Sequence, residues 1–144
     1  MPIEMNELFG IAGKVAVITG AGGVLGGNIA KHFMRQGAKV VAVDIRQEQL
    51  DKRVSELKQY GNEVIGIVGD VLDVASLEKL AGQVLSQWGK IDILLNIAGG
   101  NMPGATLEPE QHFYDMDIAC WEKVTGLNMN GTVYPSMVFG KVMA

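Results

Sequence analysis

A group of glycines after an apolar run carries the clearest chemical signal in this chain. Residues 15–18 are apolar and mostly β-branched, as expected of a parallel strand that is buried on both faces. Several glycines follow this run, among them Gly20, Gly22, Gly23 and Gly26. Glycines let the backbone turn sharply and approach a ligand closely, which any Cβ would obstruct. A helix expected from about Leu25 points unpaired N–H groups and a partial positive charge at this turn, so a pyrophosphate can bind there without a basic side chain.

An aspartate closes the next apolar run. Val40–Val43 predicts a second strand, and Asp44 follows it, eighteen positions after Gly26. A carboxylate in this place can accept hydrogen bonds from the ribose hydroxyls of a dinucleotide. Ile45, the next residue, is expected to contact the cofactor at the same site. The 2′-phosphate of NADP would bring a second anion to the carboxylate, so NAD is expected as the cofactor and NADP is disfavoured. Arg46 could swing toward a phosphate, stack on the adenine or lie in solvent.

The spacing of the glycines resembles that of one protein family. Thr19-Gly20-x-x-x-Val24-x-Gly26 resembles the T-G-x-x-x-G-x-G turn of the short-chain dehydrogenase/reductases, with Val24 in the place of the middle glycine. Three further segments resemble the same family in the same order: Asp70-Val71, Asn96-Ile97-Ala98-Gly99, and a stretch from Trp121 to Gly131 that contains Asn128. The resemblance covers about residues 12–144, and the chain is identified as a member of this family.

The resemblance implies a role for each of these segments. Val24 and Leu25 would belong to the cofactor turn, and Asp70 and Val71 would contact the adenine ring. Asn96, Ala98 and Gly99 would line the other side of the cofactor, while Asn128 would be the asparagine of the catalytic tetrad, which bends its helix and binds a water in the proton relay. Simpler roles stay open: Asp70 could cap a turn, Asn96 could stabilise the backbone between strands, and Asn128 could only bend its helix.

The chain lacks the remaining catalytic residues of that family. The family's general acid is a tyrosine followed four residues later by a lysine, both C-terminal to the position of Asn128. In this chain the residues four positions after the three tyrosines are Val64, Ile118 and Val138. Residues 1–144 are therefore expected to form a single dinucleotide-binding domain, truncated before that segment, from an enzyme that transfers a hydride between NAD and a carbonyl or alcohol carbon. The alternative is a non-catalytic nucleotide-binding module.

A long irregular segment from Gly99 to about Met116 carries a second resemblance. Gly100-Asn101-x-Pro103-x-Ala105-Thr106 is similar to a subgroup of the family that acts on sugar acids such as mannonate and fructuronate. Asn101 and Thr106 could donate to or accept from substrate hydroxyls, or they could belong to an ordinary turn.

Strands and helices alternate along the whole chain. Strands are expected at 15–18, 40–43, 64–68 and 91–95, and helices from about Leu25 to Gly37, around Leu50–Leu57, after a cap at Asp73, and over Thr132–Ala144. Right-handed crossovers then predict a doubly wound, Rossmann-like parallel sheet of order 3-2-1-4 in a three-layer α/β/α fold, with the nucleotide across the strand ends between strands 1 and 4.

Composition limits the partners. A net charge of −4 argues against nucleic acid or an anionic membrane, so the expected partner is a small-molecule substrate. Met1-Pro2-Ile3-Glu4 lacks the basic start of a secretion signal and no run approaches ~18 apolar residues, which favours the cytoplasm. The full-length form is expected to be a homo-oligomer paired through the helix near Asn128, and the isolated chain is expected to self-associate.

Histidine and cysteine indicate no further chemistry. His32 and His112 have no second ligand at metal-binding spacing, so no metal site is predicted. Cys120 is the single cysteine, which rules out an internal disulfide and suggests packing beside Trp121.

Overall fold

The computed structural model describes residues 9–61 and 63–144, so the interpretation of Met1–Glu4 lies outside the described residues. Four parallel strands form one sheet in the predicted order β3-β2-β1-β4. Their bounds are β1 Val15–Thr19, β2 Lys39–Asp44, β3 Val64–Val68 and β4 Ile93–Asn96. The central strands β1 and β2 are almost wholly buried, because both faces and both edges are covered, which matches their β-branched sequences.

Strand β4 begins two residues later than predicted. At this end of the sheet the N–H of Val15 donates to the carboxylate of Asp92 (2.8 Å) instead of to a backbone carbonyl, so regular pairing starts only with Ala16 opposite Ile93. Ile91 is still buried at 4% exposure, which explains why the apolar pattern included it.

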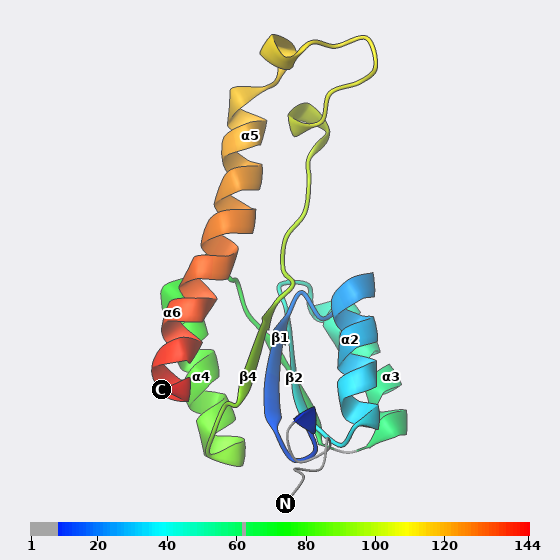
Figure 1. Cartoon of the computed structure of the whole chain (residues 1–144), viewed down its shortest axis with the longest axis vertical. Helices are drawn as coiled ribbons and strands as arrows, with labels where there is room; N and C mark the ends of the chain where they lie inside the picture. The colour runs from blue at the N-terminus through cyan, green and yellow to red at the C-terminus, as the bar shows by residue number, and fades with distance from the viewer. Residues whose placement is uncertain (1–8, 62) are drawn as a thin grey trace, which may run out of the picture.

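Helices cover both faces of the sheet, as the three-layer prediction requires (Figure 1). One face is covered by α2 (Val24–Arg35) and α3 (Gln47–Leu57), whose apolar residues form a core with Ile18, Val40 and Ala42. The other face is covered by α4 (Val74–Trp88) and α6 (Gly131–Met143), which pack on the opposite side chains of β1 and β2, including Val17 and Val41. The alternation of side chains along each strand therefore builds two separate cores.

Local signals set the ends of the helices. Gly37 follows α2 with a φ of +79°, and Gly89 follows α4 with a φ of +74°, a backbone conformation that favours glycine. At the start of α4 the side chain of Asp73 accepts the N–H of Ser76 (3.2 Å), which is the cap expected from the sequence.

An arm stands away from the sheet after β4 (Figure 1). It contains the short 3₁₀ turns η2 (Pro103–Ala105) and η3 (Phe113–Asp115) and returns through α5 (Ile118–Thr125). A π-helical turn, η4 (Gly126–Asn130), joins α5 to α6, so the helix predicted around Asn128 is present but is irregular at that residue. Cys120 packs in the arm, where a Cβ added to Gly104 would lie 2.6 Å from its Sγ. None of the helices described is long and apolar enough to cross a membrane.

Candidate functional site

A cleft of about 400 Å³ opens beside the glycine turn that follows β1, at the carboxyl ends of the strands. Most of the residues predicted to contact a cofactor line it: Gly20, Gly23, Val24, Leu25, Gly26, Asp44, Ile45, Asp70, Val71, Ala98 and Gly99. Gly22, Asn96 and Asn128 were also predicted for the site but do not line the cleft. Five further residues complete the lining: Val43, Gly69 and Leu127, which were not predicted for the site, Ile97, which belongs to the predicted segment after β4, and Arg46, for which a contact with the cofactor was one of the open alternatives. Each of these five residues is adjacent in sequence to a predicted site residue, so its place beside a motif could have indicated it.

Two glycines of the turn are required by close backbone approach. Gly20 has a φ of +67°, and a Cβ there would lie 2.8 Å from the amide nitrogen of Ala98. A Cβ on Gly26 would lie 2.5 Å from the carbonyl oxygen of Gly20. Val24, by contrast, is the first residue of α2, and no described non-glycine residue has a positive φ. Valine therefore fits in the place of the family's middle glycine, with its side chain 79% exposed at the rim of the cleft.

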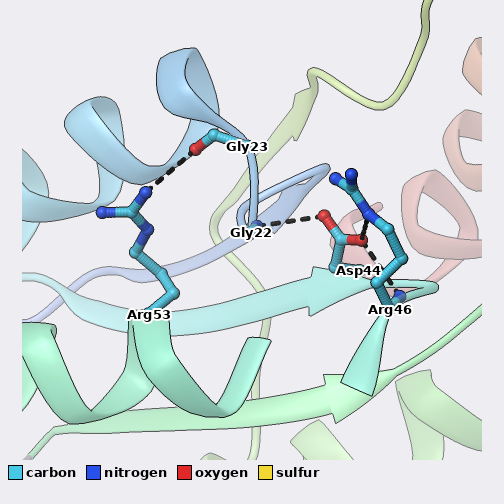
Figure 2. A network of polar contacts seen from close by, with 5 residues as sticks. All are labelled: Gly22, Gly23, Asp44, Arg46 and Arg53. Atoms are coloured by element: carbon cyan, nitrogen blue, oxygen red, sulfur yellow. Dashed lines mark hydrogen bonds and ion pairs between the residues drawn. The ribbon is translucent and has the colours of Figure 1, made fainter. Parts of the chain in front are cut away.

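Asp44 binds the glycine turn directly (Figure 2). Its Oδ2 accepts the N–H of Gly22 at 3.1 Å, and its Oδ1 accepts both the backbone N–H and the Nε–H of Arg46 at 3.1 Å. The carboxylate side chain is only 4% exposed, whereas that of Arg46 is 54% exposed. Gly22 is needed here too, because a Cβ would lie 2.7 Å from Oδ2. The structure thus gives Arg46 a partner that the sequence did not suggest.

Thr19 joins the two sides of the cleft. This side chain is fully buried at the end of β1, and its Oγ1 accepts the N–H groups of Ile97 and Ala98, both at 3.1 Å. The segment after β4 is therefore held against the glycine turn. The sequence motif includes Thr19 but does not by itself indicate this role.

Asn96 points into the packing between the sheet and α6. Its Nδ2 donates to Ser136 Oγ at 3.0 Å, and its Oδ1 is buried with no hydrogen-bond partner among the residues described. This side-chain contact ties β4 to α6, which is neither the cofactor contact nor the backbone contact between strands considered for Asn96.

Asn128 fastens the arm to the helices. Its Oδ1 accepts the N–H of Gly100 at 3.3 Å, and its Nδ2 donates to the carbonyls of Gly100 (2.7 Å) and Val124 (2.8 Å). A Cβ on Gly99 would lie 2.5 Å from the same Oδ1. The bond to Val124 links η4 to α5, so the side chain of Asn128 supports the irregular helix and the chain after β4 together.

Asp70, Asn101 and Thr106 all take part in local turns. Asp70 lines the cleft and also caps a turn, since its Oδ1 accepts the N–H of Leu72 at 2.8 Å. In the arm, Nδ2 of Asn101 donates to Thr106 Oγ1 at 2.7 Å and its Oδ1 accepts the N–H of Met102. Asn101 and Thr106 therefore form a turn in this structure, which is the simpler of the two roles that their sequence allows.

Two carboxylates outside the cleft have shifted pKa values. Partial burial opposes ionisation of Asp92, but hydrogen bonds from Lys90 and the Val15 N–H, together with the charges of Lys90 and Lys14, hold its pKa below the ordinary value. Backbone N–H groups of Cys120 and Ala119 lower the pKa of Asp117, the cap of α5. Both groups stabilise elements and lie outside the cleft lining.

The histidines show no ligand geometry. His32 and His112 are exposed. Within 9–61 and 63–144, no three His, Cys, Asp or Glu residues gather as metal ligands would.

Known proteins carry the same arrangement. Residues 14–144 match the family model for short chain dehydrogenase, and the chain belongs to this family. An uncharacterised oxidoreductase of Bacillus subtilis is 38% identical over 98% of this chain and 52% of its own length. The chain spans about half the length of the curated relatives it matches.

Solved structures of the family show the same fold. A protein from Haemophilus influenza, provisionally assigned as a D-mannonate oxidoreductase and solved with bound NAD, superposes with a TM-score of 0.86 at 34% identity over 92% of this chain and 51% of that one. A short chain dehydrogenase/reductase from Burkholderia phymatum in complex with NAD has a TM-score of 0.77 at 32% identity, over 94% of this chain and 46% of that one.

Proposed function

We propose that this chain is the cofactor-binding part of an NAD-dependent oxidoreductase that transfers a hydride between the nicotinamide and a carbonyl or alcohol carbon. The observation that carries the proposal is the cleft at the carboxyl ends of β1, β2 and β4, which joins the glycine turn, Asp44 and the segment after β4. In open α/β sheets such a crevice, where the strand order reverses, is where ligands bind. Residues 1–144 are proposed to act as one dinucleotide-binding domain.

The residues present fit a dinucleotide. Gly20 and Gly26 form a cradle that a Cβ would fill, and no side chain caps the first turn of α2. The free N–H groups of that turn suit a pyrophosphate. Asp44 at the other end of the cleft suits ribose hydroxyls, and Asp70 and Val71 suit the adenine. NAD, when bound, supplies the hydride acceptor or donor, and this chain's own residues bind and orient it.

Asn128 is proposed to serve the reaction from the arm side of the cleft. Its side chain is occupied by Gly100 and Val124, so what it contributes is the position of the chain after β4 and the π-helical shape of η4. Proton transfer is proposed to need the tyrosine and lysine of the family, which this sequence does not contain in Tyr-x-x-x-Lys order.

A sugar acid is the proposed substrate class. The similarity of residues 100–106 to sugar-acid oxidoreductases supports it, as does the D-mannonate assignment of a structural neighbour. Asn101 and Thr106 would exchange their mutual hydrogen bond for hydrogen bonds with substrate hydroxyls.

We also propose a cytoplasmic location and a homo-oligomeric full-length form. Cell fractionation tests the location, and light scattering tests the oligomeric state.

The test separates binding from turnover. The 144-residue chain should bind NAD in calorimetry but should not oxidise or reduce any sugar acid, because its sequence contains no Tyr-x-x-x-Lys to donate the proton. A form extended by a Tyr-x-x-x-Lys segment should turn over. Turnover by the 144-residue chain, free of longer contaminants, would refute the missing-group argument, and binding without turnover in the extended form would favour a non-catalytic module instead.

A further inference from the structure

Arg53 contacts the glycine turn from α3, a helix that no sequence motif had assigned to the site. It lies in α3, and its Nη2 donates to the carbonyl oxygen of Gly23 at 3.2 Å (Figure 2). Its Nη1 pairs with Glu56 at 2.7 Å, which fixes the plane of the guanidinium. The side chain is 23% exposed, and its Nε is buried without a hydrogen-bond partner among the described residues. Arg53 does not line the cleft, so it acts on the turn rather than on a ligand.

Gly27 provides the space for Arg53. A Cβ on Gly27 would collide with the Cζ and Nε atoms of the guanidinium, so the guanidinium occupies the space beside the backbone of α2 that Gly27 leaves open. Gly27 is in the first turn of this helix, where glycine is less stable than alanine and where the T-G-x-x-x-G-x-G pattern asks for no glycine. The second of two adjacent glycines therefore has its explanation in a contact with α3.

The carbonyl that Arg53 holds belongs to the peptide unit that opens α2. In a trans peptide the C=O and N–H groups point in opposite directions. Since the Gly23 carbonyl also accepts the N–H of Gly27 at 3.1 Å, two donors keep its oxygen on the α2 and α3 side. The N–H of Val24, in the same peptide plane, is thereby directed the other way. Gly22 and Gly23, which have no side chains, would otherwise allow this peptide to rotate.

We propose that Arg53 is a positioning residue for the dinucleotide: through the Gly23 carbonyl it holds the Val24 N–H toward the pyrophosphate site, and Gly27 is the glycine that admits its guanidinium. This inference rests on the proposed function. Asp44 holds the Ala21–Gly22 peptide of the turn through the Gly22 N–H, so charged side chains bind backbone groups of two consecutive residues, Gly22 and Gly23.

The test compares ligands with and without a pyrophosphate. Calorimetry measures the Kd of NAD and ADP-ribose, and NMR titration measures that of adenosine, for the intact wild-type protein and for Arg53→Met. We expect Arg53→Met to weaken NAD and ADP-ribose by up to about tenfold, because the lost hydrogen bond no longer holds the peptide in the binding orientation before the ligand arrives, and to leave adenosine within about twofold. Arg35→Met, which removes the same side chain from the exposed far end of α2, should change none of the three.

A second variant keeps the test decisive if Arg53→Met does not fold. Gly27→Ala places a methyl group where the guanidinium lies, yet it raises the helix propensity of α2, so weaker NAD binding cannot come from a weaker helix. It should weaken NAD and ADP-ribose to a similar extent, again sparing adenosine.

The outcomes that overturn the inference are distinct from failure of the proposed function. Unchanged NAD affinity in both variants, or equal loss of NAD and adenosine, would show that Arg53 only stabilises the fold. A wild-type protein that does not bind NAD at all would instead refute the proposed function and remove the inference with it.

Discussion

Asp44 provides the buried negative charge of the cleft. Its carboxylate is buried, bonded to the glycine turn through Gly22 and partly neutralised by Arg46. The same negative charge that suits ribose hydroxyls opposes a 2′-phosphate, while Arg46 at the rim offers a counter-charge to one. We therefore expect the preference between NAD and NADP to depend on the balance of these two side chains.

Substitutions at these two positions should move cofactor preference in opposite directions. Two unit charges about 4 Å apart interact by ~4 kcal/mol at an effective dielectric of ~20, so even half of that favours NAD over NADP by roughly tenfold or more. Asp44→Ala should narrow or reverse the ratio, and Arg46→Ala should widen it. Binding of both cofactors to the three proteins measures this, and a wild type that binds NADP as tightly as NAD would exclude the role given to Asp44.

Asp92 should make stability depend on pH in the acid range. Its folded-state pKa lies below the unfolded value of about 3.9, so ionised Asp92 stabilises the fold above that pH, and this contribution is lost as the pH falls through the folded pKa. Asp92→Asn should lower the free energy of unfolding by about 1 kcal/mol at pH 7. Urea denaturation at pH 7 and pH 3 measures it. The difference from wild type should shrink at pH 3, and a constant difference would contradict the electrostatic account.

At the scale of elements, the turn between β1 and α2 depends on its neighbours. Backbone groups of the turn contact β2 through Asp44, the segment after β4 at Ala98, and α3 through Arg53. The first turn of α2 is thus held in a shape that leaves its N–H groups for a ligand. Glycine is needed at positions where an added Cβ would collide with a neighbouring segment, and it can be replaced where an added Cβ would meet no atom.

Two glycine-to-alanine changes should therefore have opposite effects. Gly26→Ala places a Cβ against the Gly20 carbonyl, so it should abolish measurable NAD binding and destabilise the chain. Gly82 in α4 is exposed, with nothing within 4 Å of an added Cβ, and Gly82→Ala should stabilise by about 0.5–1 kcal/mol without affecting NAD. Thermal melts and calorimetry on both variants test this, and normal NAD binding by Gly26→Ala would contradict the packing argument.

At the scale of the whole molecule, the segment from α5 to α6 keeps several apolar side chains exposed. Exposed apolar side chains follow the rod formed by α5, η4 and α6: Ile118, Trp121, Met129, Val133, Met137 and Met143. Of these elements, α6 covers the sheet with its other face, where Phe139 is fully buried, whereas α5 stands in the arm (Figure 1). A surface of this kind favours association with another apolar surface.

The 144-residue chain should self-associate through this rod. Met137 is 68% exposed, and Met137→Glu should reduce the average mass in light scattering at high concentration. Ser55→Glu, which adds the same charge on exposed α3 across the sheet, is the control and should leave the mass unchanged. A wild-type chain that stays monomeric at high concentration would count against the prediction.

Local sequence patterns determined the elements, and together with the crossover rule and the family resemblance they indicated the strand order and most of the cleft. Strand and helix periods, glycine positions and the Asp73 cap act over a few residues, so they could be read without knowing which segments meet. The carboxyl ends of parallel strands necessarily share one edge, which is why the glycine turn, Asp44 and Ala98–Gly99 could be grouped in advance.

Only the tertiary structure decided which partners the polar side chains take. Arg53 bonds Gly23 across 30 positions, Asn128 bonds Gly100 across 28, and Asn96 bonds Ser136 across 40. Such pairs depend on the depth and angle at which a helix packs on its neighbours. The packing of many side chains together sets this depth and angle, so no local sequence pattern reveals them. The sequence shows the pair Gly26-Gly27, but only the packing of α3 on α2 explains why the second position is a glycine.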